Sequence, residues 1–136
     1  MDHLEQLYRH WLQDLWGGDY DLAPEILTPG FTGHWPDREV HGPDGAVEAI
    51  RRSHALFGDI NTTLDVGPVI DGDRLAARWT FHGTYQGGIP GTTAPPGTRI
   101  SFTGHDIFRA EGRRFAEYWV VSDVLGMMTR LGALGG

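Results

Sequence analysis

The chain has 136 residues, of which 40% are hydrophobic, and a net charge of −7 when histidines are counted as neutral. This length and composition predict a single globular domain over residues 1–136, and the acidic balance argues against nucleic-acid binding, which needs a basic face. Because the sequence contains no cysteine, disulfides, thiol nucleophiles and cysteine metal sites are excluded.

The sequence lacks the features of membrane and secreted proteins. No apolar run approaches the ~20 residues that cross a bilayer. The N-terminus, Met1 to Glu5, is acidic and polar, unlike a signal peptide. We therefore expect a soluble, cytoplasmic protein that does not bind membranes.

Helical patterns occupy the first part of the chain. Apolar residues at helical spacing predict helices over residues 4–15, 19–27 and 42–57. Between the second and third helices, residues 31–35 predict a short strand. The apolar stripes of such helices usually pack into the core. The alternative for the first helix is that Tyr8, Trp11 or Leu15 lines a cavity.

Three residues of this part are candidates for lining a small-molecule pocket: Trp11, His34 and Trp35. Aromatic side chains are common in such pockets. The alternative for Trp11 is burial in the core, and the alternative for His34 is a structural or surface role.

Strand patterns occupy the rest of the chain. Residues 60–70 predict a strand whose Gly-Pro interruption indicates a bulge or an edge position. A turn signal at residues 71–73 leads into a second strand over residues 74–85, which carries Leu75, Ala77, Trp79, Phe81 and Tyr85 on one face. Residues 86–98 are rich in glycine and proline and predict a loop that forms a mobile rim over the pocket mouth.

The most informative segment is a predicted β-hairpin that joins residues 99–109 to residues 113–123. A turn centred on Glu111 and Gly112 puts two carboxylates opposite each other on one face, and an imidazole opposite a phenol on the other. The expected pairs are Asp106 with Glu117 and His105 with Tyr118. The candidate pocket residues of the strands are Trp79, Phe81, Phe102 and Trp119.

The carboxylates of this hairpin are candidate catalytic bases. Removal of a proton next to a ketone needs a base and a donor for the oxyanion, and a carboxylate among aromatic rings has its pKa raised by desolvation. Asp106 and Glu117 meet this description, unless they face solvent or pair with arginines. Asp123 is a further catalytic candidate, or the cap of a short helix over residues 124–134.

Three segments carry a family resemblance: residues 100–109, residues 117–123, and Gly42-Pro43-Asp44-Gly45 at the start of the third helix. In these segments the chain resembles the SnoaL-like polyketide cyclases of the nuclear-transport-factor-2-like superfamily. The resemblance implies an α+β fold in which a cone-shaped, curved antiparallel sheet and N-terminal helices enclose a pocket. It also implies a homodimer formed sheet to sheet, a hydrophobic small-molecule ligand, and no metal or organic cofactor.

The resemblance further implies an aldol cyclisation, or a related isomerisation, of a hydrophobic polycyclic ketone. His105 matches the family's pocket histidine, and we expect it to act with Tyr118 or a water. Val120 stands where many relatives carry an aspartate, so that Asp106, Glu117 or Asp123 would have to replace it. Because adjacent strand residues face opposite ways, the sequence leaves open whether the histidine face or the carboxylate face lines the pocket.

Two alternative functions stay open at this point. An epoxide hydrolase needs an Asp-Arg-Asp cluster, for which Asp106, Arg109 and Asp123 supply the residue types. A non-catalytic ligand-binding or dimerisation module of the same fold would bind a ligand and leave it unchanged.

Overall fold

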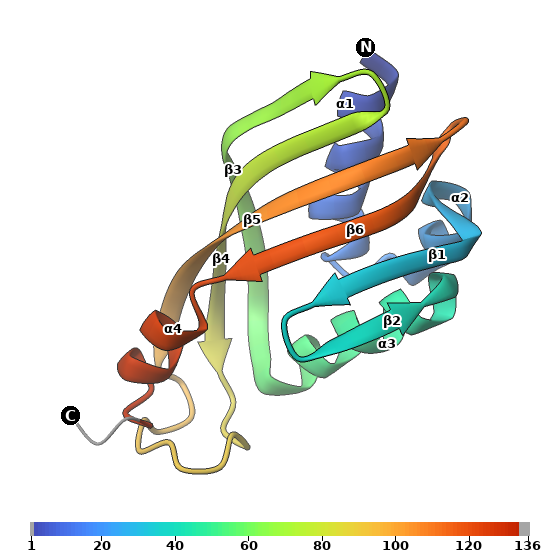
Figure 1. Ribbon diagram of the computed structural model, residues 1–136. Coiled ribbons are helices and arrows are strands. Elements are labelled where there is room, and N and C mark those ends of the chain that lie inside the picture. The colour runs from blue at the N-terminus through green and yellow to red at the C-terminus, as the bar shows by residue number, and fades with distance from the viewer. Residues whose placement is uncertain (1, 134–136) are drawn as a thin grey trace.

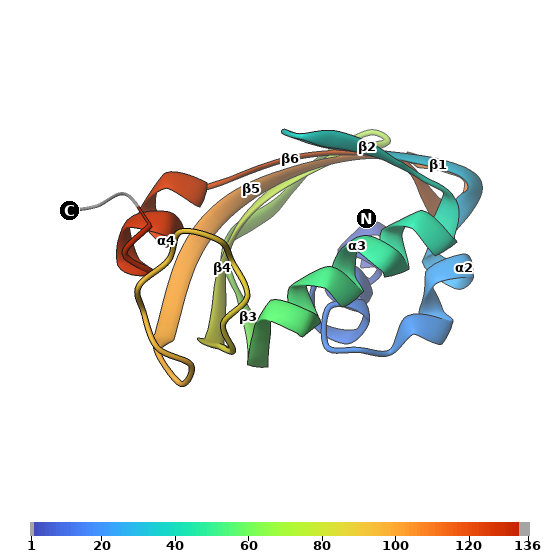
Figure 2. The ribbon, with the colours of Figure 1, turned by 90° about the horizontal axis from the view of Figure 1, so that it is seen from below.

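A curved sheet of six strands forms one layer, and the N-terminal helices lie on its concave side (Figure 1, Figure 2). A computed structural model describes residues 2–133. The strands are β1 (Leu27–Trp35), β2 (Arg38–His41), β3 (Phe57–Asp71), β4 (Arg74–Tyr85), β5 (Arg99–Glu111) and β6 (Arg114–Ser122). Their order across the sheet is β2-β1-β6-β5-β4-β3. This arrangement confirms the expected α+β fold, in which the sheet curves around the helices like an open cone.

The helical segments agree with the predicted positions. They are α1 (Asp2–Arg9), the π-helical segment η1 (His10–Leu15), the short 3-10 turn η2 (Tyr20–Leu22), α2 (Ala23–Ile26), α3 (Gly42–Leu56) and α4 (Val124–Arg130). Within the described part of the chain, no helix has the length and apolar character needed to cross a membrane. The strand β2 was not predicted, and β1 begins earlier than the expected strand over residues 31–35.

The predicted first helix changes its winding halfway. In η1 the Trp16 N–H donates to the Trp11 carbonyl oxygen at 3.3 Å, which is the wider spacing of a π-helix. The stripe that contains Tyr8, Trp11 and Leu15 is buried against the concave face of the sheet. Short π-helical segments are often found at functional sites, and this one lies beside the candidate site described below.

One pair of strands differs from the antiparallel sheet that was expected. β1 runs parallel to β6, with Gly33 opposite Tyr118, whereas all other neighbouring strands of the described sheet are antiparallel. Only strands joined by a tight turn must run antiparallel. Most of the chain lies between β1 and β6, so their connection sets no such constraint.

The hairpin of β5 and β6 is confirmed, but its predicted register is wrong. Asp106 lies opposite Val120 instead of Glu117, which is a slip of three residues. The turn falls at residues 112–113, where Gly112 has a φ of 62°, and Ala116 is an extra bulged residue on β6. Because the slip is an odd number, it exchanges the two faces of β6.

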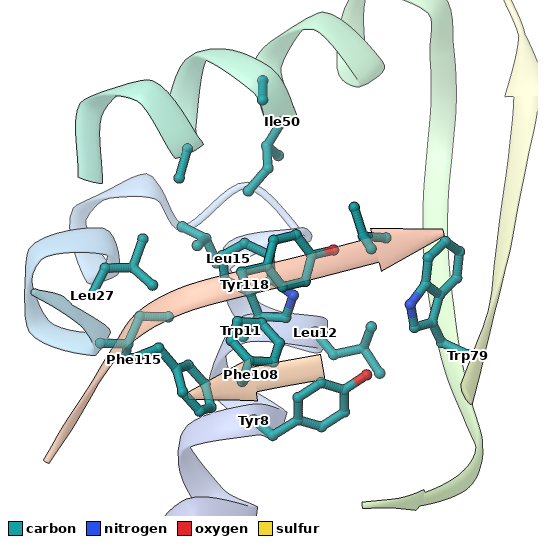
Figure 3. Close-up of a cluster of buried hydrophobic side chains, with 14 of the residues drawn as sticks. Tyr8, Trp11, Leu12, Leu15, Leu27, Ile50, Trp79, Phe108, Phe115 and Tyr118 are labelled. Atoms are coloured by element: carbon teal, nitrogen blue, oxygen red, sulfur yellow. The ribbon is translucent and has the colours of Figure 1, made fainter. Parts of the chain in front are cut away.

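Aromatic side chains fill the space between the helices and the sheet (Figure 3). Phe108 on β5 stacks on Phe115 of β6, with ring centroids 4.0 Å apart. Trp11 of η1 contacts Phe108 and Tyr118 at centroid distances of 5.1 and 4.8 Å. These contacts fix η1 against β5 and β6, and thereby set the position of the candidate site.

The loop over residues 86–98 is irregular, as expected, and it is anchored at two points. The Ile89 N–H donates to the Tyr85 hydroxyl at 2.9 Å. The N–H groups of Thr93 and Ala94 both donate to the Leu131 carbonyl oxygen at 3.0 Å. The loop therefore packs against the end of α4, and its role as a mobile rim stays a prediction.

Candidate functional site

Asp106 is the one charged residue that is fully buried in the described part of the chain, with 1% of its surface exposed. It lies on the concave face of β5. The Tyr8 hydroxyl, from α1, donates to its Oδ2 at 2.9 Å, and the Tyr118 hydroxyl, from β6, donates to its Oδ1 at 3.0 Å. Figure 3 shows both hydroxyls and the Trp79 indole nitrogen pointing to the same region. Three separate elements therefore converge on this carboxylate.

Gly104, two residues before Asp106 on the same face of β5, makes room for this arrangement. Gly104 lies opposite Trp79 in the pairing of β5 with β4. A Cβ atom at Gly104 would overlap the Trp79 ring, so the indole can lie flat against β5 only because this residue has no side chain. The edge of the indole is thereby held beside Asp106.

Burial raises the pKa of Asp106 to about 6. The Trp79 indole and the hydroxyls of Tyr8 and Tyr118 oppose this shift, because they favour the charged carboxylate. The Trp79 N–H lies close enough to Asp106 to favour the charged carboxylate, although it has no hydrogen-bond partner among the described residues. The Asp106 carboxylate is thus a stronger base than an exposed aspartate.

The two tyrosines act as hydrogen-bond donors at neutral pH. Burial raises the pKa of Tyr8 and Tyr118 well above the ordinary value, and the nearby Asp106 charge raises each further. Both phenols therefore keep their protons and hold the carboxylate in place.

A small cavity of about 20 Å³ lies between Asp106 and η1. Five aromatic residues contribute to its wall: Trp11, Trp16, Trp79, Phe81 and Tyr118. A volume of this size holds roughly one water, whereas ligand pockets commonly measure about 300–1,000 Å³. A ligand of several rings therefore needs the wall to move.

The predicted pocket residues divide into those at the cavity and those away from it. Trp11, Trp79 and Phe81 line it. Phe102 lies opposite Phe81 in the pairing of β5 with β4 and stacks on its ring at a centroid distance of 4.8 Å, but it does not line the cavity. Trp35 packs edge-on against Tyr118 at 5.0 Å.

His105 does not lie in the pocket, contrary to the expectation. It is exposed on the convex face of the sheet, opposite Arg78 on β4 and Val121 on β6. Adjacent strand residues face opposite ways, so burial of Asp106 forces the His105 side chain outwards. The expected pairing of His105 with Tyr118 is therefore wrong.

Glu117 also lies on the convex face, in a charged cluster. It accepts from His34 Nε2 at 2.8 Å and from Arg109 Nε at 3.2 Å. The His34 hydrogen bond, with a further contribution from Arg109, lowers the pKa of Glu117. His34 in turn stacks on Trp119, with centroids 5.5 Å apart. These three candidate site residues, His34, Glu117 and Trp119, share one cluster outside the cavity.

Asp123 has the capping position that the sequence left as its alternative. Its Oδ1 accepts from the Gly126 N–H at 2.9 Å at the start of α4. Arg109 lies on the convex face with Glu117, whereas Asp106 lies on the concave face. The structure therefore does not bring Asp106, Arg109 and Asp123 together, and the epoxide-hydrolase cluster is not formed.

Sequence reasoning missed the contribution of Tyr8. The sequence placed it on the apolar stripe of the first helix, with cavity lining as the alternative, and its partner Asp106 is 98 residues away. One signal could have pointed to it: a phenol in a core-facing stripe needs a hydrogen-bond partner when it is buried. The sequence alone does not show which partner that is.

Comparisons with known proteins agree with this architecture. The model of the SnoaL-like polyketide cyclase family matches residues 5–131. TsrD from Streptomyces laurentii is 36% identical, with a TM-score of 0.83 over 98% of this chain and 97% of that one. IdmH from Streptomyces antibioticus is 25% identical, with a TM-score of 0.77 over 96% of each chain. No curated protein matches the sequence significantly.

A third similar structure agrees in fold alone. It is a SnoaL-like polyketide cyclase from Agrobacterium tumefaciens, with 22% identity and a TM-score of 0.77 over 95% of this chain and 98% of that one.

Proposed function

Since the chain belongs to the SnoaL-like polyketide cyclase family, we propose that it removes a proton next to the carbonyl of a hydrophobic ketone, with Asp106 as the base. The observation that carries this proposal is the Asp106 carboxylate, which is buried at an aromatic cavity, held by two tyrosine hydroxyls and has a pKa of about 6. A base whose pKa lies near the working pH is suited to proton transfer.

The proposed step balances without a cofactor. One Asp106 oxygen takes the proton from the carbon beside the carbonyl, and the electron pair of the C–H bond moves into the enolate. In a cyclisation the enolate carbon then attacks a second carbonyl of the same molecule. Asp106 returns its proton to the alkoxide that forms, and in an isomerisation it returns the proton to another carbon.

The position of Val120 supports Asp106 as the replacement for the family aspartate. Val120 lies directly opposite Asp106 in the pairing of β6 with β5, and both side chains are buried. Side chains of opposite residues on one face lie within about 4.5–5.5 Å of each other. A carboxylate carried by Asp106 therefore reaches the same region as one carried at position 120.

A second candidate is a binding module that leaves its ligand unchanged, since the cavity wall must open for a ligand just as it must for a substrate. A space of about 20 Å³ next to the base is too small for a polycyclic substrate in the described conformation. The two candidates differ in one observable, because only an enzyme with a working base exchanges the protons beside a carbonyl.

The test uses an acetylnaphthalene in heavy water, with deuterium uptake at its methyl group followed by NMR. The wild type is expected to accelerate the uptake, and Asp106→Asn is expected to lower the rate at least a hundredfold, in line with the loss of a general base. Glu117→Gln is the matched control, because it neutralises a carboxylate on the convex face. Equal rates for Asp106→Asn and wild type would favour the binding module.

We also propose a homodimer in which the convex faces of two sheets pack together. Figure 2 shows no helix over the convex side of β5 and β6. Ile107 is 48% exposed and Val121 is 66% exposed on this face, and antiparallel sheets with apolar residues on both faces need a cover for each. Sedimentation equilibrium at micromolar concentration is expected to give the mass of a dimer for wild type and of a monomer for Val121→Glu. A monomeric wild type would contradict this part of the proposal.

A further inference from the structure

Two indole N–H groups at the Asp106 cavity have no acceptor. Trp11 is fully buried and Trp79 is 9% exposed, and the Nε1 atoms of both lack a hydrogen-bond partner among the described residues. Both side chains line the cavity that Asp106 also lines. A buried donor without a partner costs free energy, and such donors are uncommon in folded proteins. Two of them at one cavity indicate a site for an acceptor atom.

The chemistry of these donors defines the acceptor. An indole N–H can only donate a hydrogen bond. The hydroxyl protons of Tyr8 and Tyr118 are already directed to Asp106, so neither hydroxyl can donate to a further atom in the cavity. The two indole N–H groups therefore call for an acceptor atom, such as the oxygen of a carbonyl group.

We propose that Trp79 and Trp11 bind the carbonyl oxygen of the ligand and place its neighbouring carbon at Asp106. This inference rests on the proposed function, and it deepens it by naming the donors that stabilise the enolate oxygen. As the proton leaves, negative charge develops on that oxygen, where fixed dipoles in a dry site are most effective. Figure 3 shows the Trp79 nitrogen facing the region to which the Tyr8 and Tyr118 hydroxyls point, and both hydroxyls donate to Asp106.

The rest of the ligand has a second hollow available. A depression of about 190 Å³ lies outside the cavity, between η1 and β3. The two hollows share Trp16 and Thr62 in their walls. Thr62 Oγ1 donates to the Leu12 carbonyl oxygen at 2.8 Å, which fixes Thr62 to η1, whereas Trp16 is half-buried and touches Phe81 only edge-on. Displacement of the Trp16 ring would join the hollows, with the carbonyl inside and the ligand body outside.

The test follows the indole N–H signals in proton–nitrogen correlation spectra while an acetylnaphthalene is added. An ethylnaphthalene of nearly the same shape, which lacks the oxygen, serves as the comparison probe. The Trp79 and Trp11 signals, assigned with Trp79→Phe and Trp11→Phe, are expected to move downfield with the ketone only. The same movement is expected in Asp106→Asn, where the base is absent but the donors remain.

The affinities provide a second readout. Trp79→Phe is expected to bind the ketone about tenfold more weakly, which is the effect of one hydrogen bond, and to bind the hydrocarbon unchanged. Trp119→Phe, which removes an indole on the convex face, is the matched control and is expected to bind both probes like wild type. The titration is repeated with Trp16→Ala, in which the passage between the hollows is open.

The outcomes separate this inference from the proposed function. Equal indole shifts with both probes, or shifts confined to Trp16, would overturn the inference, and so would a failure of both wild type and Trp16→Ala to bind the ketone. If Asp106→Asn abolishes proton exchange while the Trp79 signal never moves, the base assignment stands and the indole site is wrong. If the ketone shifts both indole signals but no exchange occurs, the indole site stands and the proposed function is wrong.

Discussion

The Tyr8 hydroxyl on α1 lies 2.9 Å from Oδ2 of Asp106 on β5 and donates a hydrogen bond to it. This contact joins the first helix to the middle of the sheet through a buried carboxylate. Tyr118 completes the arrangement from β6 at 3.0 Å from Oδ1. The position of the base therefore depends on the packing of three elements that are far apart in the sequence.

Replacement of Tyr8 or Tyr118 by phenylalanine should raise the pKa of Asp106 further above 6. Each hydroxyl stabilises the charged carboxylate, so its removal leaves the burial effect less opposed. Each variant should also lose about 1–2 kcal/mol of unfolding free energy with the hydrogen bond. Carbon NMR titration of the Asp106 carboxyl in each variant checks the direction of this pKa change. A pKa that falls in either variant would show that the hydroxyls do not act on the carboxylate.

Asp106→Asn should change how stability depends on pH. The folded-state pKa of about 6 is higher than the ordinary 3.8, so the folded protein binds this proton more tightly than the unfolded chain. The resulting stabilisation is complete below about pH 4 and is lost as pH rises through about 6, with an amplitude on the order of 3 kcal/mol. Urea unfolding of wild type and variant across this range measures the difference.

The control variant, Glu117→Gln, should change the dependence of stability on pH in the opposite direction. The pKa of Glu117 is lowered by His34 and Arg109, so its stabilisation is present above the ordinary pKa and is lost as pH falls. Glu117→Gln should therefore remove stability at neutral pH, by a small amount because the group is partly exposed. A wild type that loses no stability relative to Asp106→Asn between about pH 4 and 7 would contradict the raised pKa.

His105→Ala should leave proton exchange unchanged. The ring is exposed on the convex face and has no path to the cavity on the other side of the sheet. Surface substitutions of this kind usually change stability by about 0.5 kcal/mol or less. Exchange rates and urea unfolding test both statements. A large loss of exchange in a folded dimeric variant would mean that this histidine reaches the substrate after all.

Gly104→Ala should destabilise the protein by about 1–3 kcal/mol, because the added methyl group overlaps the Trp79 ring and a packed core resists the displacement. Gly30→Ala is the matched control, since a Cβ atom there meets nothing within 4 Å. Thermal unfolding of the two variants makes the comparison. Equal stability would show that Trp79 can move away from Asp106 at little cost.

Sequence periodicity predicted much of the fold. The strand over residues 74–85 and its buried face were predicted correctly, because alternation is regular where no bulge interrupts it. The turn before it was also correct, since Gly72 has a φ of 63° and Asp71 pairs with Arg74. Local patterns determine such elements.

The candidate site was less predictable, and two residues explain why. Gly112 fits either of two turn positions in the sequence, and the bulge at Ala116 has no signature that alternation reveals. Together they decide whether Tyr118 or Glu117 shares a face with Asp106. The contact with Tyr8 depends on tertiary packing across 98 residues, which no local pattern contains.

The pH profile of proton exchange tests the central claim most directly. The rate for the acetylnaphthalene in wild type, followed from about pH 4 to about pH 9, should rise to a plateau with a midpoint near 6, the pKa of the Asp106 carboxyl. The same profile should persist in His105→Ala and disappear in Asp106→Asn. A midpoint that moves with His105→Ala, or a pH-dependent rate that survives in Asp106→Asn, would contradict the assignment of Asp106 as the base.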